Sequence, residues 1–247
     1  MNKSTIVASL IGLCAMTANA QAIYDYLSEK APEAYKYNEY YYQRASHFAE
    51  LTVDDDDIII LGNSLSDNGR WNEAFDDANI KNRGIISDVV QGISDRLELV
   101  TKGKPKKIFL LIGVNDVSHH LTPDSITTAV EKLIVKIKQQ TPTTEIYLQS
   151  WLPINNDFKR YKNMIGKEMV IFHGNVMLEQ VARRQGLTWI NLFPAFADKE
   201  MKLPKHLTND GLHLNDAGYR IWCQEIATAF KYALALLHNR NLFGIIK

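Results

Sequence analysis

Short apolar runs alternate with longer amphipathic segments along most of the chain, and this alternation constrains the fold more than any other feature. Five runs have the length and composition of buried strands: 58–61, 80–83, 108–112, 145–150 and 188–192. The segments between and after them repeat apolar residues at helical spacing, over 89–100, 124–140, 165–184 and 215–237. Such alternation predicts an α/β fold, a three-layer α/β/α sandwich with a five-stranded parallel sheet.

The domain organisation follows from length and composition. The chain has 247 residues, of which 46% are hydrophobic, and no linker, repeat or low-complexity segment divides residues 58–247. We therefore expect one domain over 58–247. Residues 21–57 form a tyrosine-rich extension, which we expect to be helical and to pack on that domain. The alternative is that its tyrosines line a sugar-binding rim, because their rings are apolar and their hydroxyls form hydrogen bonds.

The first twenty residues have the pattern of a signal peptide. Lys3 is followed by an apolar stretch over 6–16 and by Ala18-Asn19-Ala20, a small-x-small cleavage site. The apolar stretch is shorter than the ~20 residues needed to span a bilayer, so we expect export to the periplasm or the medium without stable membrane insertion. A retained membrane anchor is the alternative. Cleavage leaves Cys223 as the one cysteine, which we interpret as a buried helix residue.

Charge narrows the classes of partner and ligand. The 28 basic residues balance the 28 acidic ones and form no cluster, so we expect a small-molecule substrate and neither nucleic acid nor a polyanion. Asp54–Asp57 is a run of four carboxylates. Consecutive side chains of an extended segment point in different directions, which favours a solvated loop over a calcium site. We predict no metal site.

Ligands of parallel sheets bind at the carboxyl ends of the strands, so the residues that follow the strands carry the functional signal. Ser64 follows the first strand and a glycine, where a tight turn can expose its Oγ at the start of a helix. Gly84 ends the second strand and can bring a backbone N–H close to a ligand. Asn115 follows the third strand, where its amide can stabilise an oxyanion or can simply form a turn with Asp116.

A histidine near the C-terminus completes this set. Asp210 precedes His213 by three residues, so its carboxylate can reach His213 Nδ1 and leave Nε2 free to accept a proton from a serine. His206 has no aspartate at that spacing. We expect His206 to flank the pocket at most, and His119-His120 to lie in a surface loop, because adjacent histidines do not readily share a metal.

Three further residues are candidate substrate contacts. Trp71 follows the serine turn and Trp151 follows the fourth strand, so either ring can shape a substrate pocket or pack in the core. Asn63 precedes Ser64 and is the third candidate.

Taken in order, these segments resemble the SGNH/GDSL hydrolase superfamily over residues 58–233. The defining positions match Ser64, Gly84, Asn115 and His213, and Asp210 matches the triad acid. Asn63 departs from the pattern, since many relatives have aspartate there, and this bears on subfamily more than on catalysis. The resemblance implies an SGNH-hydrolase (flavodoxin-like) fold and a serine esterase that uses neither a metal nor an organic cofactor.

The resemblance also implies a mechanism and a substrate class. Ser64 attacks the ester with His213 as base, and the oxyanion is held by the N–H groups of Ser64 and Gly84 and by the Asn115 side chain. The segments look most like the branch of platelet-activating-factor-type acetylhydrolases and sialate O-acetylesterases. That branch implies short-chain, O-acetyl esters of carbohydrates such as sialic acid. The alternatives are a lysophospholipase or thioesterase of the same superfamily and a non-catalytic carbohydrate-binding module.

Overall fold

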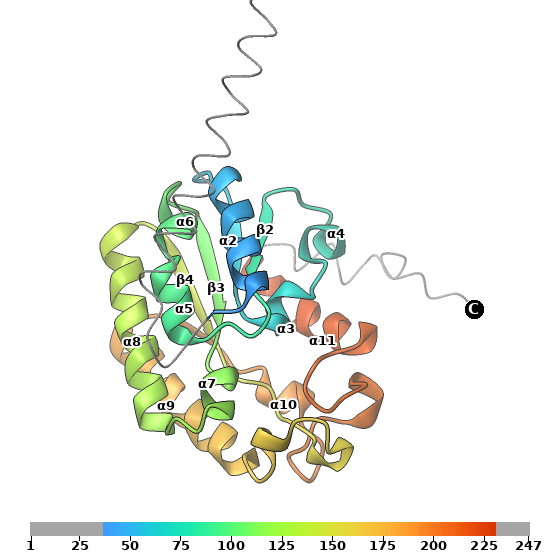
Figure 1. The fold of residues 1–247 in the computed structure, drawn as a ribbon. Coiled ribbons are helices and arrows are strands. Elements are labelled where there is room, and N and C mark those ends of the chain that lie inside the picture. Colours follow the sequence, from blue (N-terminus) through green and yellow to red (C-terminus); the bar gives the residue numbers. More distant parts are fainter. Residues whose placement is uncertain (1–36, 231–247) are drawn as a thin grey trace, which may run out of the picture.

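The computed structural model describes residues 37–230 (Figure 1). Its centre is a sheet of five parallel strands in the order β2-β1-β3-β4-β5. The strands are β1 (Ile58–Gly62), β2 (Ile80–Gly84), β3 (Lys107–Leu111), β4 (Glu145–Gln149) and β5 (Thr188–Ile190). All five predicted strands are present, with boundaries that differ from the expected ones by at most two residues.

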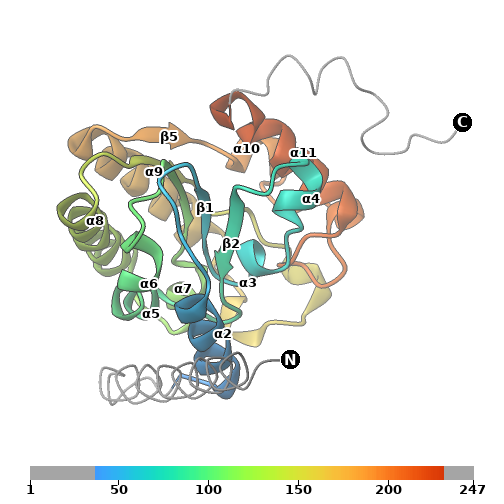
Figure 2. The same ribbon diagram turned by 90° about the horizontal axis from the view of Figure 1, so that it is seen from above.

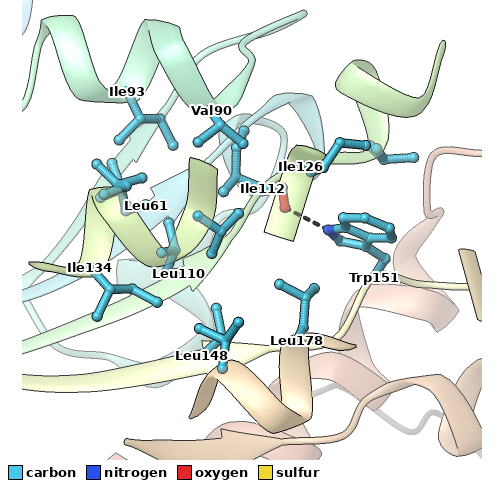
Figure 3. Packing of buried hydrophobic residues seen from close by; sticks show 14 of the residues in the cluster. Leu61, Val90, Ile93, Leu110, Ile112, Ile126, Ile134, Leu148, Trp151 and Leu178 are labelled. Atoms are coloured by element: carbon cyan, nitrogen blue, oxygen red, sulfur yellow. Dashed lines mark hydrogen bonds between the residues drawn. The ribbon is translucent and has the colours of Figure 1, made fainter. Parts of the chain in front are cut away.

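Helices cover both faces of this sheet, which confirms the three-layer sandwich (Figure 2). The main ones are α4 (Trp71–Phe75), α5 (Val90–Asp95), α8 (Pro123–Gln140), α9 (Glu168–Gln185), α10 (Phe193–Phe196) and α11 (Asp216–Ala227). Side chains alternate along β1, so Ile59 and Leu61 enter one core with α5, α8 and α9, whereas Ile58 and Ile60 enter the other with α4, α10 and α11. Figure 3 shows the first of these cores.

The helix boundaries differ from the predicted ones at three places. The helix expected over 89–100 is split into α5 and α6 (Glu98–Thr101), and the break lies at Arg96, whose guanidinium is buried in the core. The helix expected from 165 begins at Glu168. The last α-helix, α11, ends at Ala227 and is followed by a 3-10 turn over Thr228–Phe230. Residues 231–237 of the predicted helix lie outside the described part.

The described tyrosines of the N-terminal extension pack on the main body. Helix α2 (Glu39–Glu50) begins after Asn38, whose side chain accepts the N–H of Tyr41. Tyr41 is buried and its hydroxyl donates to Gly92 O at 2.7 Å, while the Tyr40 hydroxyl donates to Asp67 Oδ2 at 2.6 Å. These contacts support packing rather than a sugar-binding rim. The earlier tyrosines and the predicted signal peptide lie outside the described residues.

Two other sequence predictions are tested by burial. Asp57 is only 2% exposed and accepts the N–H of Asp54 at 2.9 Å, so it holds a turn and is not part of a solvated run. Cys223 is buried in α11, as expected, and burial raises the pKa of its thiol to about 12.

Between residues 37 and 230, no helix is both long and apolar enough to cross a bilayer. Within the same range, no cluster of three or more His, Cys, Asp or Glu side chains could hold a metal ion.

Candidate active site

Ser64 lies at the carboxyl edge of the sheet, directly after β1. Asn63 caps the short helix α3 (Ser64–Asp67) by accepting the N–H of Leu65 at 3.1 Å, and its carbonyl accepts the N–H of Ser66. The sequence therefore turns sharply from strand to helix at this serine. The turn brings the Oγ of Ser64 to within 2.9 Å of His213 Nε2.

Asp210 orients the imidazole of His213 from the other side. His213 Nδ1 is 2.7 Å from Asp210 Oδ2, and Asp210 Oδ1 accepts the backbone N–H groups of Leu212 and His213 at 2.9 and 2.8 Å. Burial alone would raise the pKa of Asp210, but the hydrogen bonds from His213 and Leu212 outweigh it and lower that pKa to about 2. The carboxylate is therefore ionised and fixed in orientation at neutral pH.

The loop that carries these two residues is held by a neighbouring loop. Gly211 lies between Asp210 and His213 with a φ of 87°, a left-handed conformation that glycine adopts without strain. Its carbonyl accepts the N–H of Asn155 at 2.8 Å, and an added Cβ would approach Asn155 O to 2.2 Å. Only glycine fits this close backbone contact.

Tyr161 is a third partner of the Asp–His pair. Its hydroxyl donates to Asp210 Oδ2 at 2.8 Å and lies 3.0 Å from His213 Nδ1. Burial and the bond to Asp210 raise the pKa of this phenol to about 12, so it remains a donor at neutral pH. Sequence reasoning missed Tyr161. It lies in an irregular loop between β4 and α9, where neither spacing nor periodicity marks it.

A cavity of about 590 Å³ opens beside Ser64. Besides Ser64 and His213, it is lined by Ile86, Ser87, Val114, Asn115, Ser118, Arg160, Tyr161, Lys162, Asn163, Met164 and Leu212. This volume is typical of sites for small molecules.

The structure brings Asn115 to the same cavity as Ser64. Asn115 lies in helix α7 (Val114–Ser118), directly after β3, and its Nδ2 donates to Asp88 O at 2.9 Å. A carboxamide nitrogen has two hydrogens, so this bond fixes the side chain and leaves a second donor.

Gly84 does not enter the site, and its predicted role as an oxyanion donor is wrong. Its N–H donates to Asn82 Oδ1 at 2.9 Å, and Gly84 does not line the cavity. An added Cβ would approach the Asp67 nitrogen to 2.3 Å, so glycine is needed here because β2 packs closely on α3.

Ser87 occupies the place expected of Gly84. It lines the cavity with a φ of 65°, and its N–H has no hydrogen-bond partner among residues 37–230. A serine in this left-handed conformation has no reliable sequence signal, because most residues other than glycine, asparagine and aspartate avoid it.

A buried ion pair between Asp88 and Arg96 supports both Ser87, which precedes Asp88, and Asn115, whose side chain binds the Asp88 carbonyl. The side chains of Asp88 and Arg96 are fully buried, with 2.8 Å between Asp88 Oδ2 and Arg96 Nη2. Arg96 also donates to the carbonyl of Arg83 at 2.9 Å and to that of Gly62 at 3.4 Å, so it joins the ends of β1 and β2. Burial raises the pKa of Asp88 to about 6, although Arg96 opposes the shift.

The three predicted substrate contacts all lie in the interior, so those predictions are wrong. Trp71 and Trp151 are at most 1% exposed, and their indole N–H groups donate to Ser66 O and to Ile112 O, respectively. Figure 3 shows Trp151 with its bond to Ile112. Asn63 is fully buried and caps α3. Both indoles find a backbone carbonyl inside the protein, and none of the three side chains lines the cavity.

Three histidines of residues 37–230 that the sequence analysis considered stay outside the site, as expected for His119 and His120. Both are exposed, as is His206, and none of the three lines the cavity. His213 is therefore the histidine that faces Ser64.

Comparison with known proteins gives a consistent family and fold. Residues 60–221 match the model of the GDSL-like Lipase/Acylhydrolase family. A GDSL-like lipase from Bacteroides thetaiotaomicron is similar in structure, with a TM-score of 0.68, 21% identity and coverage of 78% of this chain and 98% of that one. An acetylxylan esterase from Geobacillus stearothermophilus is also similar, with a TM-score of 0.57, 17% identity and coverage of 72% and 94%. At these identities the similarity shows the fold.

One curated protein is also similar. The N-acylneuraminate cytidylyltransferase of Escherichia coli O18:K1:H7 is 28% identical over 182 residues, which are 71% of this chain and 40% of that protein. The chain therefore spans less than half the length of this relative.

Proposed function

The chain belongs to the GDSL-like lipase/acylhydrolase family and is a carboxylester hydrolase, and on this premise we propose that it removes O-acetyl or similar short acyl groups from carbohydrates such as sialic acid. The observation that carries the proposal is the continuous line of hydrogen bonds from Ser64 through His213 to Asp210 at a cavity of small-molecule size.

In the proposed mechanism Ser64 is the nucleophile. Its Oγ attacks the acyl carbon while His213 Nε2 accepts the hydroxyl proton, and Asp210 stabilises the resulting imidazolium. His213 then gives this proton to the alcohol oxygen as the ester C–O bond breaks, which leaves an acyl-enzyme. Water attacks the acyl-enzyme with His213 again as base, releasing the carboxylic acid and the free serine.

We place the oxyanion between three donors: the backbone N–H groups of Ser64 and Ser87 and the Nδ2 of Asn115. Ser87 replaces Gly84 in this role because its N–H is free and its residue lines the cavity, whereas the Gly84 N–H is bound to Asn82. Such donors contribute roughly 3 kcal/mol each to the transition state in other hydrolases. Asp88, which follows Ser87 and accepts the bond from Asn115, connects two of the donors.

Tyr161 acts as a positioning residue in this scheme. It reaches the reaction through Asp210 and His213 and shares the Oδ2 atom of Asp210 with the imidazole. Its hydroxyl takes up part of the carboxylate's charge, which tunes how strongly Asp210 holds the proton on His213.

Two observations support a short acyl group and a sugar alcohol. The cavity wall combines four apolar side chains (Ile86, Val114, Met164 and Leu212) with polar and charged ones, whereas a long acyl chain needs an extended apolar groove. Among the similar proteins, one is an acetylxylan esterase and another is named for an N-acylneuraminate. Export through the segment 1–20 remains part of the proposal, and such a protein would act outside the cytoplasm.

One observation favours a lysophospholipase as the second candidate. Four apolar side chains that follow the cavity-lining residue Met164 are 38–55% exposed: Ile165, Met169, Phe172 and Val176. Exposed apolar surface of this kind can bind acyl chains or lipid.

The first experiment compares wild type, Ser64→Ala and the matched control Ser94→Ala on p-nitrophenyl acetate, butyrate and octanoate. Ser94 is a surface serine that accepts a hydrogen bond from Lys136, so its loss leaves the rate intact. We expect Ser64→Ala to be inactive and wild type to prefer acetate. A preference for octanoate would favour the lysophospholipase. A wild type that neither turns over esters nor reacts with a fluorophosphonate probe would refute the mechanism.

A further inference from the structure

The cavity wall carries positive charge, although the whole chain is neutral. Arg160 and Lys162 both line the cavity, and no aspartate or glutamate does. The two basic residues flank Tyr161, the residue whose hydroxyl binds Asp210 and lies 3.0 Å from His213. Two cations therefore line the same cavity as Ser64 and His213.

The backbone that carries these cations is fixed on both sides. The hydroxyl of Tyr161 is bound to Asp210, and its carbonyl accepts the N–H of Met164 at 3.0 Å. Met164 is 3% exposed, and its own carbonyl accepts Asn156 Nδ2 at 2.9 Å. The loop therefore presents Arg160 and Lys162 from an anchored position, which lowers the entropy cost of binding a ligand.

The acidic residues near this loop are engaged with other groups. Asp157 pairs with Lys202 at 3.1 Å, and Glu168 accepts Asn156 Nδ2 at 2.7 Å. Asp210 is occupied by His213 and Tyr161. In the described part of the chain, neither Arg160 nor Lys162 has a carboxylate partner within ion-pair distance.

We propose that Arg160 and Lys162 form an anion subsite, and that the substrate is an ester whose alcohol portion carries a negative charge. This inference rests on the proposed function: an acetyl or similar acyl group is uncharged, so a negative charge that binds the two cations must belong to the alcohol portion of the ester. A guanidinium binds a carboxylate through two parallel hydrogen bonds and an ammonium adds a point charge. The carboxylate of an acidic sugar fits this pair, and the phosphate of a lysophospholipid offers the same chemistry.

The test uses substrates that differ only in charge. We compare 9-O-acetyl-N-acetylneuraminic acid with its methyl ester and take the ratio of their kcat/KM values. Wild type should favour the free acid at least tenfold, and the preference should fall as NaCl is added, because salt screens exposed charges. Arg160→Gln and Lys162→Gln should each lower the ratio about tenfold, mainly through the KM of the acid. Lys159→Gln, an adjacent basic residue that does not line the cavity, should keep the wild-type ratio.

The outcomes separate the subsite from the proposed function. Equal kcat/KM values for acid and methyl ester in wild type would overturn the subsite, as would a ratio that Lys159→Gln lowers as much as Arg160→Gln. Failure to hydrolyse p-nitrophenyl acetate would overturn the short-acyl function instead. Turnover of lysophosphatidylglycerol that depends on Arg160 and Lys162, without turnover of either sugar, would support the subsite and replace the sugar by a phospholipid.

Discussion

Replacing Arg96 by methionine tests how the oxyanion region is supported. The change keeps an unbranched side chain in the core but leaves the fully buried Asp88 without its cation, 2.8 Å away in the native protein. It also removes the donors to the carbonyls of Arg83 and Gly62. Breaking a buried pair on one side typically costs 3–5 kcal/mol, so we expect Arg96→Met to lower the free energy of unfolding by about 4 kcal/mol.

The pH dependence of this loss follows from Asp88. Its pKa is raised on folding, to about 6, and without Arg96 it rises further. An acid whose pKa is raised by folding favours the folded state most below its unfolded pKa of about 4, and this stability is lost as pH rises through the folded pKa. The deficit of Arg96→Met should therefore be largest at pH 8 and shrink towards pH 5, where Asp88 takes up a proton.

Urea unfolding of wild type, Arg96→Met and the double variant Asp88→Asn/Arg96→Met measures both effects. The double variant removes the unpaired charge and should recover about half of the lost stability at pH 8. Its esterase rate reports whether Asn115 remains positioned through the Asp88 carbonyl. A loss below about 1 kcal/mol for Arg96→Met, or a double variant no more stable than the single one, would refute the reasoning.

Two further predictions concern the site itself. In protein labelled on Ser64 by a fluorophosphonate, the NMR signal of the Ser87 amide proton should move downfield. The signal of the Gly84 amide proton should stay in place, because this N–H remains bound to Asn82. Movement of the Gly84 signal alone would show that Gly84, and not Ser87, donates to the oxyanion. Tyr161→Phe leaves the full charge of Asp210 facing His213, so the acid limb of kcat/KM should move to higher pH by up to about one unit, the equivalent of one hydrogen bond to a charged group. The control is Tyr147→Phe, which removes a hydroxyl that binds Glu145 and should leave the acid limb unmoved. An unmoved acid limb in Tyr161→Phe would mean that Tyr161 only packs against its neighbours.

The strands and the Asp210–His213 pair were predictable for local reasons, whereas the contact of Ser64 with His213 joins residues 149 positions apart and was expected from the resemblance to SGNH/GDSL hydrolases. A buried parallel strand must be apolar on both faces, which marks β1 and β3 in the sequence and places Ser64 and Asn115 at the same edge. Asp210 and His213 are only three residues apart, so their side chains can form a hydrogen bond within a single turn of the backbone. These features depend on short stretches of residues that fix their own geometry.

The features that were missed depend on contacts between distant segments. Gly84 lies against α3 and outside the cavity because β2 packs closely on α3, which no local pattern reveals. Trp71 and Trp151 can be buried because the N–H of each indole donates to a backbone carbonyl of another segment. Tyr161 meets Asp210 across 49 residues of sequence, from a loop without periodicity.

The close backbone contact between Gly211 and Asn155 has a consequence for how this enzyme can change its substrate. The contact joins the loop that bears His213 to the loop that bears Tyr161, Arg160 and Lys162. A segment transplanted from a relative between β4 and α9 would displace His213 unless the stretch before α11 came with it. Directed evolution of this scaffold should therefore vary the two segments together.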